Sequence, residues 1–212
     1  GIIYNIIGDF TGNYVNSNNI NSWSGAIYNR GTIYNIIGNF IKNYTIGARN
    51  GAISNGGTIG NITGDFIGNY VNSSFEAYGG AIYNSGTIGN IMGDFIGNYV
   101  KSNSRAYGGA IYNSGTIGNI TGDFIGNYAK SETGEAYGGA IYNDYEGTIV
   151  NIIGDFIGNH INSKDYNYAY AYGGAIYNGG DYHPKGQINN IIGDFIGNYA
   201  YAIANYSNSY SA

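Results

Sequence analysis

One phrase returns about every 29 residues along this sequence, and that repetition limits the possible folds more than any other feature. Its most regular part is Ala-Ile-x-Asn, whose alanines are spaced by 26, 29, 29, 30 and 35 residues. These alanines are Ala26, Ala52, Ala81, Ala110, Ala140 and Ala175. A unit of this length is too small to bury a core alone, so neighbouring units must stack against one another. The repetition therefore predicts a solenoid.

A finer pattern, Ile-x-Asn, occurs three times within one unit. The three pairs are Ile111 with Asn113, Ile117 with Asn119, and Ile125 with Asn127. Residues two apart in a strand face the same side, so we expect both members of each pair to point inward and the middle residue to face solvent. Phe124 precedes Ile125 directly, and we expect a bend that turns both side chains into the core.

Stacking of these units predicts an all-β fold, a right-handed parallel β-helix or β-solenoid of about seven coils with three short strands per coil. Residues 1–212 are expected to form a single repeat-built domain that is a fragment of a longer surface protein. The segments that follow Phe-x-x-Asn, such as 101–107 and 130–137, change in content and length, so we expect loops there. A helical bundle is excluded because no helical stripe survives 38 glycines, and a collagen-like triple helix because glycine is not at every third position.

Composition excludes several classes of function. The net charge is -5 and there is no basic run, which argues against a nucleic-acid partner. With no cysteine there is no disulfide framework and no thiolate metal site. No stretch is apolar enough to cross a bilayer, so we expect contact with a membrane only through regions outside this sequence. We predict no enzymatic activity, no cofactor and no metal ion.

Two tetrapeptides carry a resemblance to a known family. Gly-Gly-Ala-Ile at 79–82, 108–111, 138–141 and 173–176 alternates with Phe-x-x-Asn, as at Phe124 and Asn127. This alternation resembles the passenger regions of the chlamydial polymorphic membrane proteins, although the first two units carry SGAI and NGAI instead. The resemblance implies an autotransporter passenger on the outer membrane of a Gram-negative bacterium. It further implies an adhesin that binds a host-cell or matrix protein or a glycan.

Tyrosine recurs at fixed places in the unit and supplies a candidate binding surface. An exposed row of rings can stack on sugars or on an apolar partner, and stacking of the rings on one another explains the same residues without a ligand. The candidate residues are Tyr83, Tyr112, Tyr142, Tyr177, Tyr107 and Tyr137. A further column contains Tyr70, Tyr99, Tyr128 and Tyr199.

Ionisable residues gather in two enlarged corners of adjacent units. They are Asp144, Glu146, Asp181, His183 and Lys185. Carboxylates held on one face of a β-helix are the groups that cleave polysaccharides, so a carbohydrate-processing lyase or hydrolase is one alternative to an adhesin. Solvated polar insertions explain the same residues without chemistry. A self-assembling filament that grows by end-to-end association is a second alternative, because both terminal units lack an obvious cap.

Overall fold

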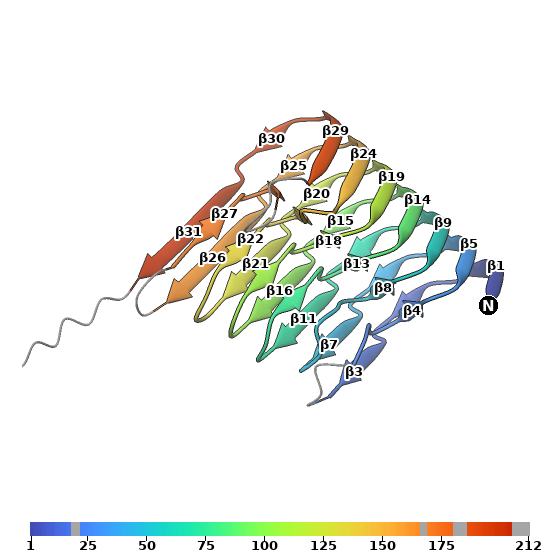
Figure 1. The fold of residues 1–212 in the computed structure, drawn as a ribbon, viewed down its shortest axis with the longest axis horizontal. Helices are drawn as coiled ribbons and strands as arrows, with labels where there is room; N and C mark the ends of the chain where they lie inside the picture. Colours follow the sequence, from blue (N-terminus) through green and yellow to red (C-terminus); the bar gives the residue numbers. More distant parts are fainter. Residues whose placement is uncertain (18–21, 166–168, 180–185, 205–212) are drawn as a thin grey trace, which may run out of the picture.

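The computed structural model describes residues 1–17, 22–165, 169–179 and 186–204 of the chain. Within these ranges neighbouring strands pair in parallel and no helix occurs. Successive copies of the repeat lie one above the other, so the chain winds into an all-β parallel β-solenoid (Figure 1). The structure confirms the prediction of a parallel β-solenoid built from tandem repeats.

Five sheets run along the described part of the solenoid, each built from the same strand of successive copies. Sheet I contains β1 (Ile2–Ile7), β5 (Thr32–Ile37), β9 (Thr58–Thr63), β14 (Thr87–Met92), β19 (Thr116–Thr121), β24 (Thr148–Ile153) and β29 (Gln187–Ile192). Sheet II contains β2 (Phe10–Thr11), β6 (Phe40–Ile41), β10 (Phe66–Ile67), β15 (Phe95–Ile96), β20 (Phe124–Ile125), β25 (Phe156–Ile157) and β30 (Phe195–Ile196).

The remaining three sheets follow in the direction of the chain. Sheet III contains β3 (Tyr14–Asn16), β7 (Tyr44–Ile46), β11 (Tyr70–Ser73), β16 (Tyr99–Ser102), β21 (Tyr128–Ser131), β26 (His160–Asp165) and β31 (Tyr199–Ala204). Sheet IV contains β12 (Ala77–Tyr78), β17 (Ala106–Tyr107), β22 (Ala136–Tyr137) and β27 (Ala171–Tyr172). Sheet V contains β4 (Ile27–Asn29), β8 (Ile53–Asn55), β13 (Ile82–Asn84), β18 (Ile111–Asn113), β23 (Ile141–Asn143) and β28 (Ile176–Asn178).

The solenoid has two separate apolar cores. The main core lies between sheets V, I and II and is filled by isoleucine, phenylalanine and the alanine of Gly-Gly-Ala. A smaller core of valine, alanine and isoleucine lies between sheets III and IV, which together form a lobe beside the main core. The segments expected to be loops, such as 130–137, therefore begin and end as strands of this lobe.

The second glycine of Gly-Gly-Ala lies where the chain passes from the lobe to the main core. Neighbouring backbones approach so closely there that no side chain fits. A Cβ atom on Gly109 would lie 2.1 Å from the carbonyl oxygen of Gly139 and 2.6 Å from the backbone nitrogen of Tyr128. The first glycine has a different role, since Gly108 adopts a positive φ of 63°. The units with SGAI and NGAI replace only this first glycine and keep the second, as Gly25 and Gly51.

The three Ile-x-Asn pairs behave differently, which corrects the expectation that all six side chains face inward. Ile111 and Asn113 are both buried. In β19 the register passes from Ile117 directly to Asn119, so Gly118 and Asn119 both lie outside and Ile120 occupies the core instead. Both paired strands skip the equivalent glycine, Gly89 and Gly118, so the strand alternation is interrupted at the same place in neighbouring coils.

The expectation for the third pair is wrong for its isoleucine. Phe124 is fully buried and stacks on the next phenylalanine, whereas the side chain of Ile125 faces outward and is half-buried. Normal strand alternation therefore holds between these two residues. Gly126, with φ of 61°, then turns the chain so that Asn127 points inward.

Buried asparagines form a continuous ladder at the corner between sheets II and III. The Asn127 backbone N–H and Nδ2 both donate to Oδ1 of Asn159, at 3.0 and 2.9 Å, and Nδ2 also donates to the carbonyl oxygen of Phe95 at 2.8 Å. Its own Oδ1 accepts from the backbone N–H and Nδ2 of Asn98. A second ladder on the outer face of sheet I links Asn119 to Asn90 and Asn151, but it is exposed.

We predict that Asn127→Ala lowers the free energy of unfolding by about 2 to 4 kcal/mol, because it leaves buried donors and acceptors of two neighbouring coils without partners. Urea denaturation monitored by circular dichroism measures this change. Asn119→Ala is the matched control, since the same amide ladder is lost in water, and it should cost about 0.5 kcal/mol or less. Equal effects of the two substitutions would contradict the assignment of the buried ladder as the stabilising one.

Candidate functional site

The six candidate tyrosines come together in the concave angle between the lobe and the main core. Rings of sheet IV pack edge-on against rings of sheet V, as for Tyr107 and Tyr142, whose centroids are 5.0 Å apart at 65°. Rings within a sheet stack face to face, as for Tyr112 and Tyr142 at 5.2 Å. The structure therefore builds one interlocked group, which we name the tyrosine corner. Its candidate members are Tyr83, Tyr107, Tyr112, Tyr137, Tyr142 and Tyr177.

The tyrosine corner is buried, which corrects the expectation of an exposed ligand-binding row. Four of its rings are at most 8% exposed, namely Tyr107, Tyr112, Tyr137 and Tyr142. Tyr83 and Tyr177 are half-buried. Sequence periodicity could not reveal this burial because the residues that cover one column belong to another strand. The tyrosine corner thus holds the lobe against the main core.

Asp144 lies beside the hydroxyl groups of two rings of the tyrosine corner. Its Oδ2 accepts a hydrogen bond from the Tyr112 hydroxyl at 2.6 Å, and its Oδ1 accepts from the Tyr142 hydroxyl at 3.2 Å and from the Tyr145 backbone N–H at 2.8 Å. Burial raises the pKa of Tyr112, and the hydrogen bond to Asp144 raises it further. Both oxygens of this carboxylate therefore accept hydrogen bonds that stabilise the local structure.

The other residues of the expected polar cluster do not join Asp144 in a site that the structure describes. Glu146 is exposed. Asp181, His183 and Lys185 lie outside the described residues. Among the described residues, no group of three histidine, cysteine, aspartate or glutamate side chains is placed to hold a metal ion.

The rim of the lobe carries a column of alternating charge. Arg105 lies between Glu76 and Glu135, with its Nε 3.0 Å from Oε2 of Glu135 and its Nη1 3.7 Å from Oε1 of Glu76. The hydroxyls of Tyr78 and Tyr137 donate to Glu76 and Glu135. An open hollow of about 480 Å³ lies beside this column, lined also by Ser104 and Asp165 among others.

The outer face of sheet III carries a row of stacked aromatic rings. Rings stack nearly parallel from coil to coil, 4.8 Å apart at 1° for Tyr70 and Tyr99 and 5.1 Å apart at 15° for Tyr128 and His160. The row comprises Tyr14, Tyr44, Tyr70, Tyr99, Tyr128, His160 and Tyr199. Each interior ring covers the faces of its neighbours, so the row offers ring edges and hydroxyls to solvent. Stacking on a sugar ring is therefore limited to its two ends.

Three lysines gather beside this aromatic row, on the same face of the lobe. Lys101 and Lys130 are direct partners in the register of β16 and β21. Lys130 Nζ is 2.6 Å from Oε1 of Glu132. The hydrogen bond from Lys130 lowers the pKa of Glu132, and the charges of Lys164 and Lys101 lower it further. The Glu132 carboxylate thus lies among three ammonium groups. We name the surface formed by Lys101, Lys130 and Lys164 the lysine patch.

Sequence reasoning missed the lysine patch because its members are about 29 to 34 residues apart in the chain. A search for a basic run cannot find them. The repeat alignment contained the signal, since Lys101 and Lys130 occupy the same position after Tyr in consecutive units.

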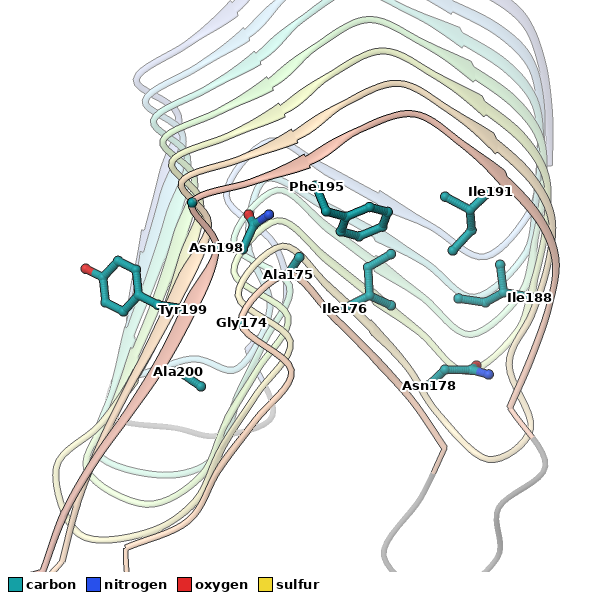
Figure 2. Close-up of a pocket in the computed structure, with 11 residues that line it drawn as sticks. Gly174, Ala175, Ile176, Asn178, Ile188, Ile191, Phe195, Asn198, Tyr199 and Ala200 are labelled. Carbon is teal, nitrogen blue, oxygen red and sulfur yellow. The ribbon is translucent and has the colours of Figure 1, made fainter.

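A hollow of about 590 Å³ opens over the main core at the coil that contains β29 and β30. Figure 2 shows Phe195, Ile191, Ile188 and Ile176 pointing into it, with Asn198 and Asn178 at two corners. Phe195 is 52% exposed, whereas the sheet II phenylalanines from Phe40 to Phe156 are fully buried. The hollow is therefore lined by side chains at the positions that form the main core in other coils.

No protein-family model, curated protein sequence or solved structure matches the chain. The resemblance to chlamydial passenger repeats therefore stays a prediction. In the described part of the chain, no helix is long and apolar enough to cross a membrane.

We predict that high pH destabilises the fold through the aromatic row. Burial, with the neighbouring Tyr128 and Tyr70, raises the pKa of Tyr99 from 10.0 to about 12. The folded state keeps this proton where the unfolded state loses it, so the contribution is complete below pH 10 and is lost as the pH rises to about 12. Urea denaturation at several pH values between these limits measures the loss.

Tyr99→Phe is the control for this titration, because it keeps the ring and removes the ionisable hydroxyl. The stability of this variant should fall less steeply between pH 10 and 12 than that of the unsubstituted chain. Identical slopes would mean that the Tyr99 hydroxyl does not contribute.

Proposed function

We propose that the protein is a non-enzymatic, surface-displayed scaffold of the autotransporter-passenger type, which acts as an adhesin of a Gram-negative bacterium. The proposed solenoid is right-handed, with about seven coils and three short strands per coil. The observation that supports this proposal is that the main core and the lobe differ in how much their residues vary between coils. Residues that face the main core repeat almost unchanged, whereas charged residues that differ between coils gather on the lobe.

The lysine patch is the part of the lobe best suited to bind a partner. Like charges placed directly opposite each other in a sheet are unfavourable, and Lys101 and Lys130 are such a pair. An anionic ligand removes this cost. The neighbouring hydroxyls of Tyr99 and Tyr128 add hydrogen-bonding groups along the same direction. We therefore propose a sulfated or uronic-acid-containing matrix glycan as the ligand, lying along the solenoid axis.

The arrangement of Asp144 favours a scaffold over a carbohydrate-cleaving enzyme. Hydrolysis of a glycosidic bond needs two carboxylates free to act as acid and as base or nucleophile. Both oxygens of Asp144 accept hydrogen bonds from tyrosine hydroxyls, and Glu146 is exposed at the surface. The polar corner is thus better explained as part of the packing of the lobe.

Binding to immobilised heparin, measured by surface plasmon resonance, tests this proposal. We expect the double substitution Lys101→Gln/Lys130→Gln to weaken binding at least about tenfold, since each lost ionic contact removes on the order of 1 kcal/mol. Binding should also weaken as salt increases. Uncharged dextran is the ligand control and should not bind.

Lys42→Gln is the matched protein control, because Lys42 is an exposed lysine between β6 and β7, far from the patch in sequence. It should bind heparin as the unsubstituted chain does. An equal loss of heparin binding with Lys42→Gln would mean that binding depends on the overall charge of the protein and not on the lysine patch. Release of shortened glycan chains during incubation would overturn the non-enzymatic assignment.

A further inference from the structure

The outer face of sheet III carries two parallel columns of side chains where β16, β21 and β26 lie side by side (Figure 1). Because successive strand residues alternate in direction, residues two apart share this face. One column contains Tyr99, Tyr128 and His160, and the next contains Lys101, Lys130 and Asn162. The lysine column therefore stops at β26, in the same coil in which histidine takes the place of tyrosine.

His160 is held in the aromatic row by a ring on each of its faces. Its ring centroid lies 5.1 Å from that of Tyr128, at 15°, and 4.9 Å from that of Tyr199, at 10°. Nδ1 lies 3.3 Å from the carbonyl oxygen of Gly158. A carbonyl oxygen can only accept a hydrogen bond, so we assign the proton of the neutral ring to Nδ1. Nε2 is then the atom that gains a proton when the ring becomes charged.

Basic groups outnumber acidic groups around His160. Strands β22 and β27 pack on the inner face of β26, where Ala136 and Ala171 meet Ile161, and they bring no charged side chain to the outer face. The titratable and charged groups on the outer face come from β21, the residue after it, β26 and β31. They are Tyr128, Lys130, Glu132, Lys164, Tyr199 and Tyr201. Figure 2 shows Tyr199 on this side, pointing away from the main core.

A positive charge on His160 adds to the charge of the lysine patch. The patch has three lysines against one glutamate, which leaves an excess of two positive charges, and a protonated His160 raises this excess to three. The faces of Tyr128 and Tyr199 favour a cationic ring between them. The nearby ammonium groups disfavour it as long as no anion is present. A sulfate group bound to the patch removes that repulsion, so anion and proton favour each other's binding.

We propose that His160 is a fourth binding residue of the lysine patch, and that it makes the affinity for a sulfated glycan rise as the pH falls from about 8 to 5. This inference rests on the proposed function, because it concerns the same ligand and the same surface. It adds a residue and a direction of pH dependence. Lysine side chains alone do not give this dependence, since ammonium groups keep their charge throughout this range.

Binding to immobilised dextran sulfate, measured by surface plasmon resonance between about pH 5.5 and 8 at constant ionic strength, tests the proposal. Dextran sulfate carries sulfate esters and no carboxylates, so the charge of the ligand stays constant. We expect the unsubstituted chain to bind about threefold more tightly at the low end, the scale of one ionic contact at a protein surface. His160→Tyr should bind equally at all these pH values. It should also fold, because Tyr128 and Tyr199 occupy this place in the neighbouring coils.

Two controls separate His160 from other titrating groups. His183→Gln removes the other of the two histidines in the sequence and should keep the pH dependence. Glu132 stays charged at the low end of the range, since the hydrogen bond from Lys130 and the neighbouring lysines lower its pKa. Isothermal titration calorimetry near neutral pH, in two buffers of different ionisation enthalpy, measures proton uptake directly. Uptake should accompany binding by the unsubstituted chain and be absent from His160→Tyr.

The outcomes distinguish a failure of this inference from a failure of the proposed function. Equal affinity of the unsubstituted chain at all pH values would overturn the role of His160 and leave glycan binding in place. So would a pH dependence that persists in His160→Tyr or disappears in His183→Gln. Absence of binding to dextran sulfate at every pH, in a chain that circular dichroism shows to be folded, would overturn the proposed function and this inference together.

Discussion

The structure depends on one interaction, the hydrogen bond that a residue makes to its own copy in the next coil. A primary amide is suited to this because it carries both a donor and an acceptor, so identical side chains can bind one another without limit. Asn98, Asn127 and Asn159 do so at 0% exposure, where an unpaired amide would be costly. A carboxylate lacks a donor and cannot form such a ladder with itself. The aspartates that precede phenylalanines of sheet II, such as Asp94 and Asp123, use the backbone instead: the N–H of Asp123 donates to Asp94 Oδ1 at 2.9 Å, at a corner that water reaches.

The same rule explains where charge is allowed. Stacking identical units about 4.8 Å apart sets like charges side by side, so a repeat protein of this kind keeps its charged fraction low, here 10%. The sequence of the lobe differs from one unit to the next, so the lobe can contain more charged residues. Glu76, Arg105 and Glu135 alternate in sign within one column, which turns repulsion into attraction. Lys101 and Lys130 do not alternate, and this is the reason to connect them with an external anion.

The repeat allowed the parallel solenoid to be predicted, because no other fold stacks a unit of this length and composition in register. Which way each side chain faces was harder to derive. Alternation correctly predicted the inward direction of Ile111 and Asn113, but it is interrupted at Gly118 and Asn119 lies outside, and no local residue pattern distinguishes this pair from the first. The tyrosine corner was missed for a different reason. Tyr112 faces outward from its own strand, as expected, and is buried by a sheet that formed where a loop was expected.

The lateral and axial surfaces of this solenoid are chemically independent. Phe195 and Asn198 belong to the columns that hold each coil to the next, so changes at these repeat positions would alter the contact between coils. Residues on the lobe rim, such as Lys130 and Arg105, contribute little to those columns. The lobe segments accordingly vary in length and charge between units, while the strands of the main core keep theirs. A chain with this division can change the side chains on its lobe without changing how its coils stack.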